Sequence, residues 1–200
     1  MKNCLSAFTL LLVTTISFGQ QQFDRDAALA FRKQLNAAYA AKESSPLTSK
    51  DLASFKGLSF FAPDAKYAVV AKFVRTAYER PFEMPTSTKR KAMYQKYGEA
   101  TFTLDGKTYK LNIYQSLEGM QSEAYKDHLF LPFTDLTSGK ESYGGGRYID
   151  LKIPAANTIL IDFNKAYNPY CAYNAGYSCP IPPRENHLKT AIRAGVKKFH

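Results

Sequence analysis

Apolar residues recur at helical spacing near the start of the chain. Ala28, Phe31 and Leu35 fall on one face, and the carboxylate of Asp24 can accept hydrogen bonds from the first amide groups of a helix. This pattern predicts a helix over residues 24–42.

A second, shorter helix is predicted directly afterwards. Pro46 ends the first helix, and Thr48 and Asp51 have the spacing of a capping box in which Asp takes the usual Glu position. The helix is expected to run to Phe55, and Gly57 ends it.

The pattern changes to strict alternation after residue 58, and a hairpin over residues 97–115 is its clearest element. Asp105-Gly106 is a favoured two-residue turn, because both positions must accept a positive φ. Pairing outward from this turn places Phe102 opposite Tyr109, apolar against apolar. The same register gives the pairs Ala100–Leu111, Thr101–Lys110 and Glu99–Asn112.

Other alternating segments predict further strands. Pro132 cannot donate to a ladder, so its strand is expected to be an edge strand or to be interrupted there. Pro154 begins a turn that could bring the last two strands, with Asp150 and Asp162, side by side. The predicted strands cover residues 67–73, 128–135, 147–153 and 157–163.

These elements predict a mainly β (α+β) fold: an antiparallel sheet curled into a barrel or sandwich, with the N-terminal helix packed on it. Residues 58–200 form its β-rich part. Beyond Asn164 the chain is rich in Pro, Asn and Tyr and is expected to form a long ordered loop. Ordered loops of this length tend to be functional or cross-linked.

The first 19 residues have the three parts of a secretory signal peptide. Lys2 supplies the positive charge, residues 5–18 are apolar, and Ser17-Phe18-Gly19 places small residues at the cleavage site. The apolar run is too short for a membrane span. We expect cleavage of residues 1–19, export to the periplasm or the cell exterior, and a single globular domain over residues 20–200. The alternative is an apolar helix that packs on the domain.

The chain is basic, with a formal net charge of +10. Such a charge is common in nucleic-acid-binding proteins. Export argues against that function, and the positive residues are scattered apart from Lys89-Arg90-Lys91 and the segment 184–198. We therefore expect a basic surface near anionic envelope polymers and no nucleic-acid partner. The sequence assigns no oligomeric state.

Four segments carry a resemblance to a known family. The chain resembles the bacterial and archaeal family known as domain of unknown function sixteen-eighty-four, and weaker similarity extends back to about Leu52. The resemblance implies family membership and no particular activity. The segments are Phe130 to Gly139, Tyr143 to Asp150, Asp162 to Tyr173 and Cys179 to Leu188.

Two loop ends hold the best candidates for a binding site. The segments 135–147 and 162–171 leave predicted strands through turn-prone sequence and concentrate polar side chains, which are costly to bury unpaired. They predict either one polar pocket or an internal hydrogen-bond network. The candidate ligand-binding residues are Asp135, Tyr143, Arg147, Asp162, Asn164, Tyr167 and Asn168.

The chemistry of these residues leaves alternatives open. The glycine run before Arg147 could bind an anion, or Arg147 could form a structural ion pair. Asp135, Asp150 and Asp162 could act as acid and base or bind a cation. The alternative for Asp150 and Asp162 is that they face solvent or accept from loop amides.

Cleavage of the signal peptide would leave two cysteines, Cys171 and Cys179, in one loop of an oxidising compartment. We expect a disulfide between them; the alternative is a pair of reduced thiols. Together with His187 they could supply three zinc ligands, but no usual ligand spacing occurs, and neither a metal nor a cofactor is predicted.

Three functions remain compatible with the sequence. The first is a binding protein for a small polar or anionic ligand. The second is an enzyme, such as a hydrolase of envelope components, that uses Asp, Arg and Tyr residues of the loops. The third is a structural protein without a small ligand. No catalytic motif decides between them.

Overall fold

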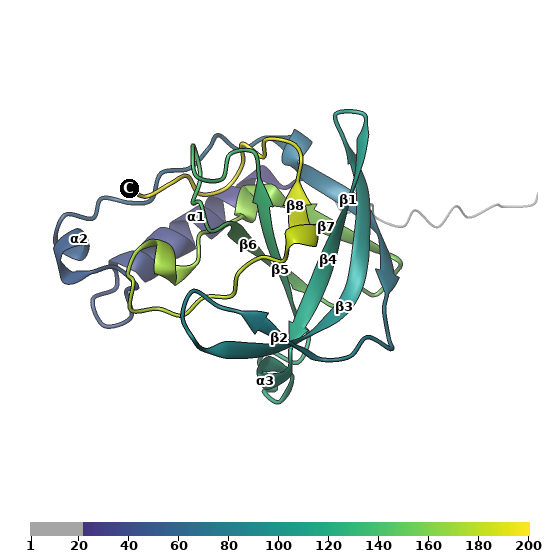
Figure 1. Cartoon of the computed structure of the whole chain (residues 1–200). Coiled ribbons are helices and arrows are strands. Elements are labelled where there is room, and N and C mark those ends of the chain that lie inside the picture. Colours follow the sequence, from purple (N-terminus) through teal and green to yellow (C-terminus); the bar gives the residue numbers. More distant parts are fainter. Residues whose placement is uncertain (1–21) are drawn as a thin grey trace, which may run out of the picture.

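A computed structural model describes residues 22–200, and the predicted signal peptide lies outside these residues. An antiparallel sheet curls into a half-barrel, and α1 lies along one side of it, so the predicted fold class is confirmed (Figure 1). The strands are β1 (Ala68–Arg75), β2 (Phe82–Pro85), β3 (Lys91–Leu104), β4 (Lys107–Ser116), β5 (His128–Asp135), β6 (Arg147–Lys152), β7 (Thr158–Asp162) and β8 (His187–Leu188).

The helices are short except for the first. They are α1 (Arg25–Ala40), α2 (Ser49–Ala53) and α3 (Leu117–Met120), with 3-10 turns η1 (Ala65–Tyr67), η2 (Phe163–Lys165), η3 (Tyr170–Ala172) and η4 (Arg184–Asn186). Among residues 22–200, no helix combines the length and apolar character that crossing a membrane requires.

Both predicted N-terminal helices begin at the predicted caps. The Asp24 carboxylate accepts a hydrogen bond from the Ala27 amide at 2.9 Å at the start of α1. At the start of α2, the Thr48 hydroxyl lies 2.7 Å from the Asp51 carboxylate and accepts from the Asp51 amide. Local capping therefore fixes where the two helices begin.

The sheet order is β6-β5-β4-β3-β1-β7, with β2 on β3 and the short β8 parallel to β5. The β3–β4 hairpin has the predicted register, including Phe102 opposite Tyr109. Its turn residues Asp105 and Gly106 have φ values of 50° and 71°. The turn requires both positive values, and Asp and Gly tolerate them.

The expected pairing of the last two strands is wrong. β6 pairs with β5, and β7 pairs with β1 through contacts such as Ala68 opposite Asp162. β6 and β7 are therefore the first and the last strand in the order of the sheet. The Ile153 amide donates to the Asp127 carbonyl, which keeps the end of β6 on β5. The segment at Pro154 therefore connects the first and the last strand of the sheet order and does not form a hairpin turn.

The strand that contains Pro132 is interrupted on one side, as predicted. β5 pairs with β4 only at Phe130, and beyond this point the Asn186 side chain lies between the two strands. Its amide donates to the carbonyls of Pro132 and Asn112 and accepts from the Asn112 amide at 2.7, 2.8 and 2.8 Å. A side chain from η4 replaces the ladder where proline cannot donate.

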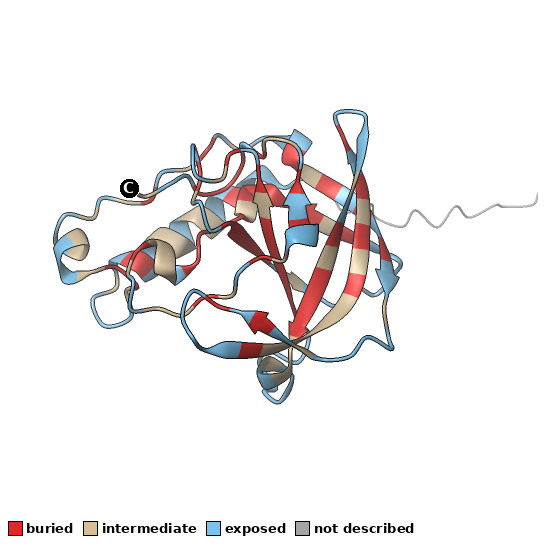
Figure 2. Cartoon of the chain, viewed as in Figure 1, coloured by how far each residue is buried: buried red, intermediate tan, exposed pale blue. Residues whose placement is uncertain are grey.

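Three groups of buried residues stabilise this arrangement (Figure 2). The main core fills the curved sheet and includes Phe102, Phe133 and Phe163. A second core joins α1 to the C-terminal loop; its buried members are Tyr39, Leu47, Leu58, Tyr173 and Val196. The third and smallest group consists of Met84, Tyr114, Phe130 and Tyr148.

Candidate functional site

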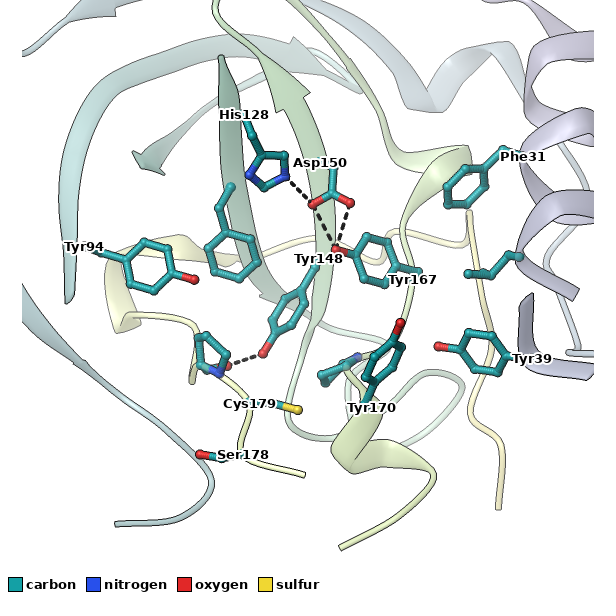
Figure 3. A pocket seen from close by; sticks show the side chains of 14 residues that line it. Phe31, Tyr39, Tyr94, His128, Tyr148, Asp150, Tyr167, Tyr170, Ser178 and Cys179 are labelled. Atoms are coloured by element: carbon teal, nitrogen blue, oxygen red, sulfur yellow. Dashed lines mark hydrogen bonds and ion pairs between the residues drawn. The ribbon is translucent and has the colours of Figure 1, made fainter. Parts of the chain in front are cut away.

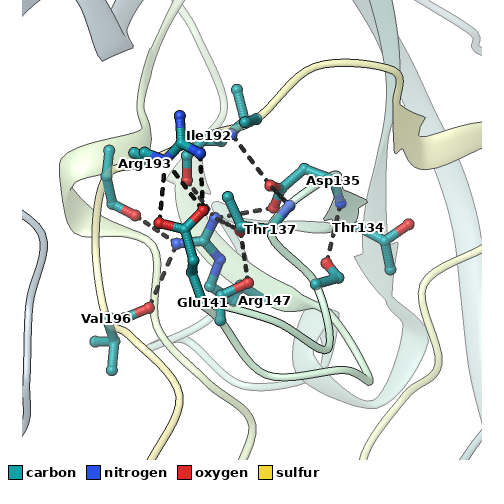
Figure 4. A network of polar contacts seen from close by, with 12 residues as sticks. Thr134, Asp135, Thr137, Glu141, Arg147, Ile192, Arg193 and Val196 are labelled. Carbon is teal, nitrogen blue, oxygen red and sulfur yellow. Dashed lines mark hydrogen bonds and ion pairs between the residues drawn. The ribbon is translucent and has the colours of Figure 1, made fainter.

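Arg147 and Asp135, two of the predicted ligand-binding residues, form an ion pair inside the protein (Figure 4). The Arg147 side chain is fully buried, and one guanidinium nitrogen lies 2.9 Å from the Asp135 carboxylate and 2.8 Å from the Ile192 carbonyl. The other nitrogen donates to the Ala194 carbonyl. The Asp135 carboxylate also accepts from the Ile192 amide at 3.1 Å. The ion pair and its hydrogen bonds to Ile192 and Ala194 hold the C-terminal segment against β5 and β6.

Gly146, the last residue of the glycine run before Arg147, allows close packing. Gly146 has φ 90°, and a Cβ there would lie 2.6 Å from the Phe133 carbonyl oxygen. Burial lowers the pKa of the Arg147 guanidinium, and the Asp135 carboxylate opposes this shift. Of the two interpretations of Arg147, the structural ion pair is the one observed.

Asp162 and Asn164 form a second internal network. The Asp162 carboxylate accepts from the Asn164 backbone amide at 3.0 Å and from its side chain at 2.9 Å. The Asn164 side chain also donates to the Asp64 carbonyl and accepts from its amide, both at 2.9 Å. Asp162 thus satisfies loop amides, one of the roles expected for it. Asn168 donates to the Lys197 carbonyl at 3.0 Å.

A cavity of about 450 Å³ lies elsewhere, between α1, the β5–β6 edge of the sheet and the loop of residues 167–180 (Figure 3). Half of its lining residues are Phe or Tyr, so its wall is largely aromatic. The lining residues are Phe31, Leu35, Tyr39, Tyr94, His128, Phe130, Tyr148, Asp150, Tyr167, Pro169, Tyr170, Ser178, Cys179 and Pro180.

Asp150 lies at the polar side of this cavity, between His128 and Tyr167 (Figure 3). Its carboxylate accepts from the Tyr167 hydroxyl, which lies 2.9 and 3.0 Å from the two oxygens, and pairs with His128 Nε2 at 2.9 Å. The side chain of Asp150 remains 51% exposed and that of His128 33% exposed. The three groups are therefore fixed in place, and the carboxylate and the imidazole are still accessible from solvent.

The backbone positions these side chains. Asp150 is opposite Phe130 in the β5–β6 ladder, so His128 lies two residues along the neighbouring strand. Tyr167 is held by two backbone hydrogen bonds with Tyr148, at 2.9 and 3.0 Å. Burial, followed by the Asp150 charge, raises the pKa of Tyr167 well above its usual value.

Tyr39 places a buried hydroxyl at the opposite wall. Its side chain is 1% exposed, and no hydrogen-bond partner for the hydroxyl is found among the described residues. The neighbouring Tyr173 ring contacts it edge to face, and the Tyr173 hydroxyl has no partner within residues 22–200 either. In Figure 3 the Tyr39 hydroxyl points from α1 toward the cavity. A buried hydroxyl without a partner costs about 1–3 kcal/mol, so a polar atom in the cavity would relieve that cost.

The two cysteines meet at the edge of the cavity, and both are free thiols. The Cys171 amide donates to the Cys179 sulfur at 3.1 Å, and the Tyr143 hydroxyl lies 3.8 Å from the Cys171 sulfur. Hydrogen bonding with the Cys179 thiol lowers the pKa of Cys171 to about 6. The same contact and burial raise the pKa of Cys179. The disulfide stays a prediction.

Of the seven predicted ligand-binding residues, Tyr167 lines the cavity. Tyr143 contacts Cys171. The other five belong to internal hydrogen-bond networks: Asp135, Arg147, Asp162, Asn164 and Asn168. The sequence pattern gave no sign that His128 or the α1 residues belong to a site, and it suggested Asp150 only for acid–base chemistry or cation binding. A β5–β6 ladder built from the sequence, with Phe130 opposite Asp150, would place His128 near Asp150. His187 contacts Thr134 at 3.0 Å, and within residues 22–200 no group of three His, Cys, Asp or Glu side chains could hold a metal ion.

Comparisons with known proteins give a family and a fold without an activity. The family model described as "protein of unknown function (DUF1684)" matches residues 53–197. The solution NMR structure of an uncharacterised protein from Haloarcula marismortui is 33% identical, with a TM-score of 0.68, and the match covers 86% of this chain and 92% of that one. No curated protein matches the chain.

Proposed function

Because this chain belongs to the family of proteins of unknown function DUF1684, we propose a function from its geometry: it is an exported domain that binds a small organic ligand in the cavity beside α1. The volume of about 450 Å³ falls in the range of small-molecule sites, which are mostly apolar with a few convergent polar groups.

The observation that carries this proposal is the unpartnered hydroxyl of Tyr39. Buried polar atoms are almost always hydrogen-bonded, and of the five that lack a partner within residues 22–200 the Tyr39 hydroxyl is the one whose residue lines the cavity, so a ligand there could supply the partner. At the other wall Asp150 is held by two donors and is still open to solvent. A ligand that spans the cavity could engage both groups.

The lining residues also restrict the charge of the ligand, which the sequence predicted to be polar or anionic. Among the described residues, the cavity wall holds one carboxylate, at Asp150, and no Lys or Arg side chain. An anion would have to approach this carboxylate, and the one basic side chain in the lining, His128, is already paired with it. The cavity therefore favours a ligand without a negative charge.

Export of the domain is part of the proposal and rests on the order of charged, apolar and small residues in the first 19 positions. The intact mass of the protein recovered from its native host tests it. A mass that corresponds to a chain beginning at Gln20 supports export, and a chain that retains residues 1–19 contradicts it.

An enzymatic function is the second candidate, favoured by the contact between His128 and Asp150. A carboxylate that orients an imidazole is a common acid–base arrangement, and a hydrolase of envelope components could use it. Turnover of labelled envelope fractions, lost in His128→Ala and Asp150→Asn, would establish this function. Absence of turnover together with saturable binding would establish a binding protein.

Native mass spectrometry of the protein isolated from its host tests ligand binding. The variant Leu35→Trp fills the cavity from α1, and Leu29→Trp places the same ring on the exposed face of the same helix. We expect a small-molecule adduct on the wild type and on Leu29→Trp that is absent from Leu35→Trp. A bare wild-type polypeptide, or an adduct that Leu35→Trp retains, contradicts the proposal.

A further inference from the structure

The groups around Asp150 offer more acceptors than donors to a ligand. The Tyr167 hydroxyl uses its proton on Asp150, and the Tyr148 hydroxyl uses its proton on the Pro180 carbonyl. Each phenolic oxygen keeps lone pairs after donating. What these two tyrosines present to a ligand is therefore an acceptor oxygen and the face or edge of a ring.

Asp150 itself keeps acceptor capacity. One of its oxygens accepts from both His128 and Tyr167, whereas the other accepts only from Tyr167, at 3.0 Å. An ionised carboxylate has about four acceptor positions, so the second oxygen can take a further donor. The side chain is half exposed, which leaves it accessible to a donor in the cavity.

The aromatic wall favours a positive charge beside this carboxylate. Phe130 and Tyr148 contact each other edge to face, with centroids 4.7 Å apart, and Tyr148 and Tyr167 do so at 5.9 Å. Ring faces attract cations, and the attraction is larger where water is excluded. Within residues 22–200, no Lys or Arg side chain lines the cavity, although the chain carries 27 such residues, and the one basic group beside Asp150 is His128, which contacts only one of the two carboxylate oxygens.

We propose that the ligand of this cavity is a protonated organic amine, whose ammonium group donates to Asp150 and whose apolar body lies against the rings of Phe130, Tyr148 and Tyr167. This inference rests on the proposed binding function and specifies its ligand class. An ammonium supplies donors and positive charge together, and both complement the acceptors and ring faces on this side of the cavity.

Three probes of similar shape separate charge from shape: benzylammonium, benzyl alcohol and benzoate, measured by isothermal titration calorimetry. We expect the wild type to bind benzylammonium at least about tenfold more tightly than benzyl alcohol and to bind benzoate most weakly. Asp150→Asn should remove this preference and leave the affinity for benzyl alcohol unchanged. The control Asp127→Asn neutralises an exposed carboxylate that does not line the cavity, and it should retain the preference.

The outcomes separate this inference from the proposed function. Equal affinity for the alcohol and the amine, or a preference that survives in Asp150→Asn, overturns the amine inference and leaves small-molecule binding in place. Failure of the wild type to bind benzylammonium also overturns it, while the native-mass comparison of Leu35→Trp with Leu29→Trp tests the cavity separately. The comparison of probes on the wild type keeps the inference testable if Asp150→Asn does not fold.

Discussion

The Tyr167 hydroxyl donates to the Asp150 carboxylate, at 2.9 and 3.0 Å from its two oxygens, although the residues come from different parts of the fold. Asp150 belongs to the edge strand β6, and Tyr167 belongs to the loop that follows β7 at the other end of the sheet. Their contact joins the two ends of the half-barrel at one wall of the cavity. This bond, together with the two backbone hydrogen bonds between Tyr148 and Tyr167, fixes this wall of the cavity.

Tyr167→Phe removes this bond and keeps the ring. Because Asp150 is half exposed and can be solvated instead, we expect a loss of only about 1 kcal/mol in the free energy of unfolding. The affinity for benzylammonium should fall as well, since His128 alone then positions the carboxylate. Denaturant unfolding and calorimetry measure the two effects, and Tyr78→Phe, at a fully exposed ring, should change neither. Equal affinity in Tyr167→Phe and the wild type would show that Asp150 needs no positioning.

Arg147→Ala should be strongly destabilising. It leaves the Asp135 carboxylate buried without its cation and removes the donors to the Ile192 and Ala194 carbonyls. Breaking a buried pair in this way costs about 3–5 kcal/mol, which urea unfolding would measure. In contrast, Arg193→Ala breaks the exposed pair with Glu141 and should have little effect.

A small loss of stability in Arg147→Ala would contradict a structural role for this residue. Retained benzylammonium binding in the folded fraction of Arg147→Ala is also expected, because Arg147 does not line the cavity. If Arg147→Ala instead lost binding and kept the wild-type melting temperature, Arg147 would be a ligand-binding residue.

Two glycines with positive φ should respond differently to substitution by alanine. At Gly106, φ is 71° and a Cβ would meet no atom within 4 Å, so the cost is that of the left-handed backbone, about 1 kcal/mol. At Gly195, φ is 76° and a Cβ would lie 2.4 Å from the Ala166 carbonyl oxygen. Strain and overlap together should cost about 2–4 kcal/mol there. Equal midpoints of thermal unfolding for Gly106→Ala and Gly195→Ala would contradict the packing of the C-terminal segment.

The Cys171–Cys179 pair should be oxidised in exported protein. A loop of this size gains roughly 2–3 kcal/mol from a disulfide in the chain-entropy model. Alkylation without reductant, followed by peptide mapping, should label neither cysteine, and two labelled cysteines in natively exported protein would contradict the bond.

The reduced protein makes a separate prediction about pH. The pKa of Cys171 is lowered to about 6, so its thiolate fraction, and with it the rate of alkylation, should rise as the pH increases through 6 and level off above. Cys179 is buried and its pKa is raised, so it should react slowly across this range. A common pH profile for both cysteines would show that the two thiols do not influence each other.

Local signals predicted much of the fold. The Asp105-Gly106 turn set the register of β3 and β4, and Asp24 and Thr48 marked the starts of α1 and α2, because in each case the interacting groups are neighbours in sequence. The pairing of β7 with β1 was not predicted, since nothing near Asp162 indicates a partner as distant as Ala68.

The candidate site was harder to predict for a related reason. Arg147 and Asn164 resembled ligand-binding residues, but their partners are largely backbone groups of distant segments, such as the Ile192 carbonyl, which no side-chain pattern marks. The cavity in turn requires α1 to lie beside β6, which brings Tyr39 and Asp150 to opposite walls. Only the three-dimensional arrangement reveals this combination.

The measurement that tests ligand binding most directly is a two-dimensional NMR titration of the isotope-labelled protein with small amines, alcohols and sugars. We predict that at least one probe shifts amide signals of α1, β6 and the loop of residues 167–180 together and saturably, and that Leu35→Trp abolishes the response while Leu29→Trp retains it. If no probe shifts these signals, or if Leu35→Trp responds as the wild type does, the cavity is not a ligand-binding site.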